Sequence, residues 1–312
     1  MTQPSIVIRP PGPKEDNFAQ FREFWRYKHL LAVLVDRGIR IRYKNSVLGV
    51  AWSMVTPILS VFVYSVLVTA ILHSGGNNES AHIAAASLPW NFFSLAILDS
   101  SAAVLQQLGL IKKIYFPREI PVISNVLQNL VQFVISFGVF LLYRYGLLAI
   151  IYHQWVGLPP YQVIYLPVVV IIMVLFTTGC AFFISATNVF YEDVKFIVSL
   201  LLTLGMYSVP VLYAAEKIRY MARFTPHQQS IIYHLYLLNP VAWVSEAFRQ
   251  MFFGVYDMSP KGPTAPYLYH VAQWTAPFDV RIMCIDGLES VLMCYLGYAY
   301  FNRLKRKFTE RP

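Results

Sequence analysis

The chain has 312 residues, of which 57% are hydrophobic and 13% are charged, and its formal net charge is +9. Charged residues make up about 25% of a typical soluble domain, so this composition argues against a protein built around one water-soluble core. The apolar residues gather in long blocks, which is typical of a helical membrane protein. Cationic loops at an anionic membrane surface explain the net charge better than binding to nucleic acid does.

Residues 1–46 predict a cytoplasmic tail followed by an amphipathic helix in the membrane interface. Residues 1–16 are polar and lack the apolar stretch that a signal peptide needs. In residues 17–39, aromatic and aliphatic side chains recur at helical spacing and alternate with cations. This pattern favours an interfacial helix over a soluble helix packed on a partner. To this helix and the basic collar after it we assign Phe21, Trp25, Arg40, Arg42 and Lys44.

The first predicted membrane span covers residues 47–72, which contain no Asp, Glu, Lys or Arg. At about 1.5 Å per residue, such a helix is about 39 Å long and exceeds the hydrocarbon core of about 30 Å. The basic collar stands directly before this span. Because cytoplasmic loops collect Lys and Arg, we place the collar and the N-terminus inside the cell.

Residues 47–312 are expected to form one all-helical transmembrane domain of about six spans, with both termini in the cytoplasm. Most of the 25 Lys and Arg residues fall in segments that this topology places inside. The second span is the weakest, because polar residues interrupt its apolar run. After the first span, the others are expected at about 88–108, 122–143, 165–187, 196–213 and 282–301.

Three motifs resemble the permease subunits of type-2 ABC exporters that move polysaccharides. They are R-I-R-Y-K-N-S-V-L-G-V-A-W-S-M-V-T-P at 40–57, K-K-I-Y-F-P-R-E at 112–119 and Y-L-L-N-P-V-A-W-V-S-E-A-F-R at 236–249. The resemblance implies an inner-membrane homodimer that binds two copies of a P-loop ATPase and moves a lipid-linked polysaccharide between its two copies. It favours O-antigen as the cargo, with capsular polysaccharide and teichoic acid as alternatives.

No catalytic or cofactor motif accompanies this resemblance. The chain has no G-x-x-x-x-G-K-[ST] sequence, no H-E-x-x-H sequence and no clustered Cys and His. We therefore expect a transport subunit without enzymatic activity or bound metal, whose partner ATPase holds the ATP and Mg. An ion-coupled secondary transporter is the alternative from another class. It would need several carboxylates inside the membrane, where Asp99 is the main one.

The connection between the second and third predicted spans is the candidate for ATPase coupling. Two prolines redirect the chain there, the aromatic side chains can enter an apolar cleft, and the cations can pair with acidic groups. The resemblance implies contact with the ATPase. The alternative is a surface turn whose lysines meet lipid phosphates. The coupling segment contains Lys112, Lys113, Tyr115, Phe116, Pro117, Arg118 and Glu119.

The candidate substrate pathway combines polar groups within spans and aromatic rings. A charged Asp99 inside a span is costly, so it either faces a wet pathway or pairs with a cation on another helix. The polar stripe on the third span either bonds to another helix or lines water. Aromatic rings stack on sugars but also form interfacial belts. The candidates are Trp52, Tyr64, Trp90, Phe93, Asp99, Asn125, Asn129, Gln132 and Tyr207, and between Trp52 and Tyr64 we choose Trp52.

The resemblance also implies that residues 214–279 re-enter the outer leaflet as short helices that form an outer gate. Asn239 and Pro240 predict a helix start, and Glu246 and Arg249 are spaced to pair on one face. The candidate gate residues are Asn239, Pro240, Trp243, Glu246 and Arg249. Residues 254–279 form a longer segment than the family pattern, so their role stays open. Asp286, near the outer end of the last span, is expected to be solvated.

Overall fold

The computed structural model describes residues 27–42, 44, 46, 52–66, 79–107, 117–147, 161–213, 215, 225–253 and 278–309. Within these ranges every regular element is helical and no strand occurs, which confirms the predicted all-helical class. The elements in chain order are α2 (Lys28–Arg42), α3 (Trp52–Val66), α4 (Glu79–Ser101), α5 (Ala103–Gln106), α7 (Ile120–Leu141), η3 (Leu142–Leu147), η4 (Tyr161–Tyr165), α9 (Leu166–Phe190), α10 (Val194–Ser208), α11 (Pro226–Leu237), α12 (Pro240–Phe253), α14 (Val280–Leu304) and η6 (Lys305–Thr309).

Four helical stretches are long and apolar enough to cross a membrane, and they correspond to four of the six predicted spans. They are Ala81–Ser101, Ile120–Gly146, Gln162–Phe190 and Val280–Leu304. The described parts of the other two predicted spans are shorter, since α3 and α10 each have 15 residues. The six-span topology therefore stays a prediction.

The helix that corresponds to the second predicted span is offset from 88–108 towards the N-terminus. The helix starts at Glu79 rather than near residue 88, and it ends at Ser101 rather than near residue 108. Residues 81–86 include four alanines, which are the best helix formers, and they extend the helix backward. Pro89 lies inside α4, so this proline does not mark the helix start.

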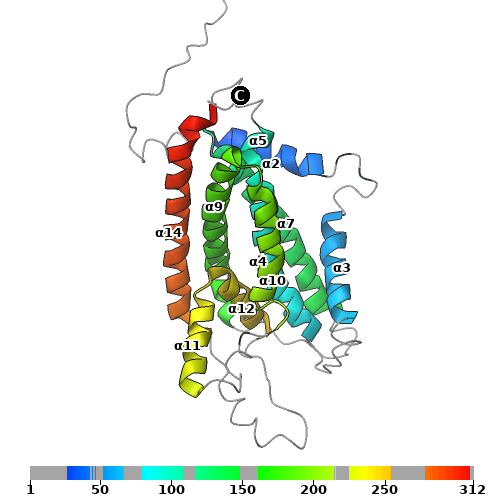
Figure 1. The fold of residues 1–312 in the computed structure, drawn as a ribbon. Coiled ribbons are helices and arrows are strands. Elements are labelled where there is room, and N and C mark those ends of the chain that lie inside the picture. Colours follow the sequence, from blue (N-terminus) through cyan, green and yellow to red (C-terminus); the bar gives the residue numbers. More distant parts are fainter. Residues whose placement is uncertain are drawn as a thin grey trace, which may run out of the picture.

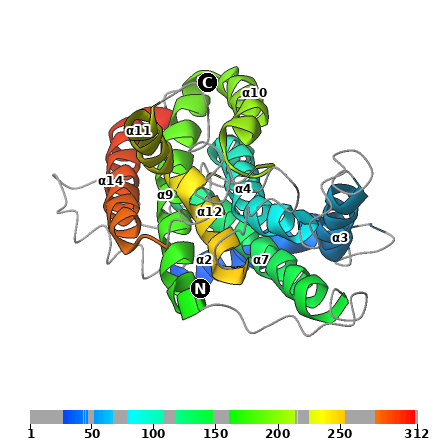
Figure 2. The ribbon, with the colours of Figure 1, turned by 90° about the horizontal axis from the view of Figure 1, so that it is seen from below.

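The membrane-length helices form a bundle with short helices lying across its two ends (Figure 1). α2 lies across one end, where the red segment η6 also sits, and we call this the α2 end. α12 lies at the opposite end, the α12 end, where α11 projects away from the bundle. Seen along the bundle from the α12 end, α3 and α14 occupy opposite margins, and α12 crosses in front of the central helices (Figure 2).

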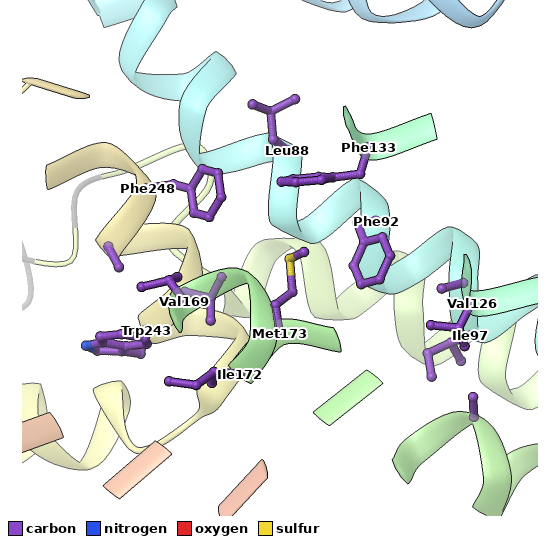
Figure 3. Close-up of a cluster of buried hydrophobic side chains, with 14 of the residues drawn as sticks. Leu88, Phe92, Ile97, Val126, Phe133, Val169, Ile172, Met173, Trp243 and Phe248 are labelled. Carbon is purple, nitrogen blue, oxygen red and sulfur yellow. The ribbon is translucent and has the colours of Figure 1, made fainter. Parts of the chain in front are cut away.

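Aromatic and aliphatic side chains from α4, α7, α9 and α12 fill the core between these helices (Figure 3). The rings of Phe92 and Phe133 meet edge to face at 5.8 Å, and Phe133 meets Phe248 in the same way at 5.8 Å. Such edge-to-face pairs add to the stabilisation that burial provides. The apolar side of α12 is thereby fixed to two membrane-length helices.

α9 and α14 approach each other most closely where both carry glycine. A Cβ atom added at Gly179 would lie 2.5 Å from the backbone carbonyl carbon of Met293, and one added at Gly297 would collide with the Gly179 carbonyl. Small residues allow this kind of close helix packing within a membrane. Towards the α2 end, the rings of Phe183 and Tyr300 stack at 4.3 Å, so the two helices form one tightly packed pair.

The expectation that Asp286 is solvated was wrong. Its side chain lies on α14 with 0% of the residue exposed, and neither carboxylate oxygen has a hydrogen-bond partner among the described residues. Its place in the first turns of α14 suggested contact with water. Burial instead follows from the side of the helix on which Asp286 lies, together with the packing of neighbouring helices over that side.

The outer margins of the bundle expose apolar side chains. On α10, Phe196 is 65% exposed, Leu200 60% and Leu204 56%. On α3, Phe62 is 62% exposed and Leu59 56%. Apolar surface on this scale requires lipid or another protein chain to cover it.

Candidate functional site

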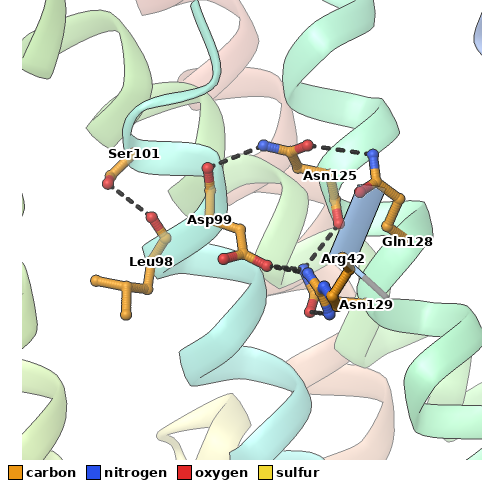
Figure 4. Close-up of polar contacts among 7 residues, drawn as sticks. All are labelled: Arg42, Leu98, Asp99, Ser101, Asn125, Gln128 and Asn129. Atoms are coloured by element: carbon orange, nitrogen blue, oxygen red, sulfur yellow. Dashed lines mark hydrogen bonds and ion pairs between the residues drawn. The ribbon is translucent and has the colours of Figure 1, made fainter. Parts of the chain in front are cut away.

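A polar cluster at the α2 end joins α2 to α4 and α7 (Figure 4). The Arg42 guanidinium donates to the Asp99 carboxylate at 2.5 Å and to the Asn129 side-chain oxygen at 3.3 Å. The Asn129 amide in turn donates to the same Asp99 oxygen at 2.8 Å. One carboxylate thus accepts from two helices, and hydrogen bonds to a charged group are stronger than neutral ones.

The neighbouring residues of α7 extend this cluster. Asn125 donates to the Asp99 backbone carbonyl at 2.9 Å, and Gln128 donates to Asn125 at 3.3 Å. Gln128 also fills the space beside Gly38 of α2. Asp99 therefore pairs with a cation on another helix, and the polar stripe of Asn125 and Asn129 bonds to α4. Their role in a substrate pathway stays a prediction, as does that of Gln132, which is half-buried on the same helix.

A second cluster at the α2 end, the Lys305 cluster, consists of Arg118, Glu119, Lys305 and Phe308. The Lys305 ammonium lies 2.7 Å from a Glu119 carboxylate oxygen. The Arg118 guanidinium donates to the Lys305 backbone carbonyl and lies 6.0 Å from the centre of the Phe308 ring. Two residues of the predicted coupling segment thus contact the segment that follows α14.

The rest of the coupling and interfacial predictions fall largely outside the described residues. This applies to Phe21, Trp25, Lys112, Lys113, Tyr115 and Phe116. Pro117 stands just before the turn that leads into α7, and its carbonyl accepts from the Ile120 backbone N–H at 3.2 Å. Arg40 and Lys44 are exposed at the α2 end, where Arg40 pairs with Asp36 at 2.9 Å.

At the α12 end, a buried ion pair connects α12 to the segment after α10. Arg249 lies 2.8 Å from Glu246, and their side chains are 3% and 2% exposed. Arg249 also donates to the backbone carbonyls of Pro210 and Tyr213, at 2.5 and 3.0 Å. Glu246 accepts from the Ala215 backbone N–H at 3.1 Å. Each charge is therefore paired with the other and with backbone groups, as burial requires, and only the Arg249 Nε of this pair has no hydrogen-bond partner among the described residues.

The start of α12 lies where the sequence predicted it. Asn239 accepts from the Val241 backbone N–H at 3.1 Å, and the helix begins at Pro240, which fits the preference of proline for the first turn. Trp243 is 4% exposed, and its ring lies 5.9 Å from that of Phe278. These contacts place all five candidate gate residues on or next to one short helix. Their gating role stays a prediction.

Two tyrosines complete the α12 end. The hydroxyl groups of Tyr213 and Tyr236 are 2.9 Å apart. Burial raises the pKa of Tyr236 above its ordinary value, and the hydrogen bond with Tyr213 acts in the same direction.

The predicted pathway aromatics divide into exposed and packed residues. Trp52 on α3 is 47% exposed and Tyr207 on α10 is 66% exposed. Trp90 is 6% exposed, and a Cβ atom added at Gly205 would lie 2.9 Å from its ring. Phe93 stacks on Phe176 at 6.0 Å. Tyr64 belongs to α3, but its side chain lies outside the description.

A known protein family matches most of the helices described above. The family model for the ABC-2 type transporter matches residues 29–253, which run from α2 to the end of α12. The chain belongs to the ABC-2 type transporter family. It is therefore the membrane permease component of an ABC transporter, which decides against an ion-coupled secondary transporter. In such transporters the ATP is bound by an ATPase partner.

Three curated relatives are similar over most of the chain, and each is named O-antigen export system permease protein RfbA. The relative from Myxococcus xanthus is 32% identical over 232 residues, which cover 74% of this chain and 83% of the relative. Two relatives from Klebsiella pneumoniae are 28% and 26% identical over 284 and 283 residues, which cover 90% of this chain and 94% of each relative.

Sequence reasoning missed two residues of the Lys305 cluster, Lys305 and Phe308. Lys305 stands in the run R-L-K-R-K at 303–307, which resembles any cationic tail on the inner side of a membrane. Phe308 follows that run with no periodic pattern to mark it. No local signal links either residue to Glu119, because 186 positions separate Lys305 from Glu119.

Proposed function

We propose that this permease exports a lipid-linked polysaccharide across the inner membrane and that the polysaccharide is O-antigen. The observation that carries the proposal is the match to three permeases named for O-antigen export, over as much as 94% of their length. Export of capsular polysaccharide or teichoic acid by the same mechanism is the alternative cargo assignment.

In the proposed assembly, two copies of the chain form the pathway between them and two ATPase subunits bind at the cytoplasmic face. Each copy crosses the membrane six times, and both termini are cytoplasmic. The exposed apolar faces of α3 and α10 support this arrangement, because lipid and a second copy would cover them. The exposed cations at the end of α2 favour the α2 end as the cytoplasmic end.

The ATPase is proposed to bind the coupling segment at residues 112–119. Arg118 and Glu119 contact Lys305 at the start of η6, and η6 lies at the same end of the bundle as α2 (Figure 1), where the proposed topology puts the ATPase. ATP and Mg belong to that partner, and hydrolysis there supplies the free energy for transport.

Trp52 is the residue that we propose for sugar stacking in the pathway. It lies on α3, and its 47% exposure leaves much of the side chain accessible to cargo. A polysaccharide can slide past an aromatic ring, because stacking of a sugar on the ring does not require one fixed position of the polymer. Trp52→Ala should therefore reduce export strongly, while Trp52→Phe retains much of it and both keep the dimer and the ATPase. Equal loss in the two variants together with failed assembly would show that Trp52 only packs.

The decisive experiment is reconstitution of the permease with its ATPase in vesicles that contain candidate glycolipids. O-antigen linked to its lipid should stimulate ATP hydrolysis, and capsular or teichoic-acid precursors should not. Phe116→Ala should leave the permease inserted but reduce its association with the ATPase by about tenfold, the usual cost of losing a buried aromatic anchor. Stimulation by another glycolipid alone would refute the cargo assignment, and normal association of Phe116→Ala would refute the coupling segment.

A further inference from the structure

The Lys305 cluster lies where three parts of the fold meet at the α2 end. Pro117, Arg118 and Glu119 end the coupling segment and lead into α7. Lys305 and Phe308 belong to η6, the segment that directly continues α14. Phe190, the last residue of α9, touches Phe308, with ring centres 5.9 Å apart. The cluster thus connects the coupling segment to the ends of two membrane-length helices.

The two charges of the cluster lie where helix termini favour them. Glu119 occupies the N-cap position of α7, and Lys305 occupies the C-cap position of α14. A helix stabilises a negative charge at its N-terminus and a positive charge at its C-terminus. Arg118 supplies a donor to the Lys305 backbone carbonyl, where α14 ends and η6 begins.

Because the Glu119 carboxylate is buried, it depends on its ion pair with Lys305. The Glu119 side chain is 7% exposed, while that of Lys305 is 26% exposed. A carboxylate this deeply buried requires a partner, and Lys305 provides it at 2.7 Å. Phe308 is 2% exposed and also meets Phe301 of α14 at 5.5 Å. The polar and apolar contacts therefore hold η6 from two sides.

The tight packing of α9 against α14 extends this connection along the bundle. The contact between Gly179 and Met293 leaves no room for the helices to approach further, so the two helices are packed as one close pair. A displacement of residues 117–119 is then passed to both helices through Lys305 and Phe308. Without these two residues, the same displacement would be absorbed at the start of α7.

We propose that Lys305 and Phe308 are positioning residues that transmit movement of the coupling segment to the α9–α14 pair. The inference rests on the proposed role of residues 112–119 as the ATPase contact. It goes beyond the family match, which ends at residue 253 and does not include η6.

The test uses the full permease–ATPase complex in vesicles with the stimulating glycolipid. Lys305→Met and Phe308→Ala should keep normal ATPase association but reduce glycolipid-stimulated hydrolysis by about tenfold. Lys305→Met loses a charge-assisted contact to a nearly buried group, and Phe308→Ala loses a buried aromatic ring. Lys305→Arg, which keeps the charge, should retain most of the stimulation. Lys307→Met is the matched control, because Lys307 is an exposed cation of the same segment.

A charge exchange keeps the test valid if the single variants fold poorly. Glu119→Lys combined with Lys305→Glu should recover part of the stimulation that either change alone removes, but not all of it, because each exchanged charge then lies at the helix terminus that disfavours it. Normal stimulation in Lys305→Met and Phe308→Ala, with ATPase association still weakened in Phe116→Ala, would overturn this inference and leave the proposed function intact. Loss of ATPase association in parallel with stimulation would also overturn it, since the cluster would then shape the docking surface alone.

Discussion

At the α12 end, the side chains of Glu246 and Arg249 are only 2% and 3% exposed, whereas at the α2 end those of Asp99 and Arg42 are 36% and 33% exposed. The first pair belongs to one helix and is enclosed by backbone groups of the segment after α10. The second pair joins two helices that are far apart in sequence. A buried ion pair fixes the local geometry, because separating it would leave two buried charges without a partner. A pair in contact with water can separate at small cost.

This difference suits the functions proposed for the two ends. An outer gate built on α12 needs a rigid helix whose position relative to residues 210–215 is fixed. A coupling end needs α2, α4 and α7 to shift against each other when the ATPase moves. Water can replace the lost partner of Arg42 or Asp99 during such a shift. Variants of three ion pairs should therefore lose stability in the order of how deeply each pair is buried.

The largest effect is expected for Arg249→Met. The change leaves Glu246 buried without its cation and removes the donors to Pro210 and Tyr213, so the free energy of unfolding should fall by about 3–5 kcal/mol. The measurement is the loss of monodisperse protein on heating in detergent. Arg281→Met, which changes an exposed arginine of α14, is the control. A thermal shift no larger than that of the control would mean that the pair does not anchor α12.

A smaller effect is expected for Asp99→Asn. The asparagine oxygen can still accept from Arg42 and Asn129, and the half-exposed Arg42 regains water, so the loss should be about 1 kcal/mol. The same heating assay gives this value, and a double-mutant cycle with Arg42→Met isolates the pair. A loss as large as that of Arg249→Met would contradict the comparison between the two ends. Increased basal ATP hydrolysis in Asp99→Asn would sharpen it, since a loosened α2 end would move more freely.

The smallest effect is expected for Asp36→Asn. Asp36 and Arg40 form an i,i+4 pair on α2 with side chains 61% and 79% exposed, and such exposed pairs contribute about 0.3–0.5 kcal/mol. The change should be almost undetectable on heating and should become negligible at high salt, where exposed charges are screened. A clear loss of stability that persists in high salt would show that Asp36 has a partner besides Arg40.

The sequence predicted the helices of this fold better than it predicted which helices contact each other. Apolar blocks of membrane length predicted the helices α4, α7, α9 and α14, because a chain in lipid must satisfy its own backbone hydrogen bonds. Asn239 and Pro240 predicted where α12 begins, and the spacing of Glu246 and Arg249 predicted their pair. These features depend on residues within one or two helical turns of each other.

The candidate site was less predictable, because its contacts join helices that are distant in the sequence. Asp99 was recognised as a costly charge, but the sequence left open whether water or a cation would satisfy it. Helical periodicity shows which side of a helix a residue occupies and says nothing about which helix covers that side. The same limit explains the wrong expectation for Asp286, whose position near a helix start suggested contact with water.

By itself, the sequence determined the helical membrane class, the family motifs and the local starts and pairs within helices, since each of these depends on residues close together in the chain. Only the tertiary structure decided that Arg42 meets Asp99, that Lys305 meets Glu119 and that Gly179 faces α14. Contacts of this kind depend on how helices pack around one another. Packing is decided by the combined shape of many side chains, and no single stretch of sequence encodes it.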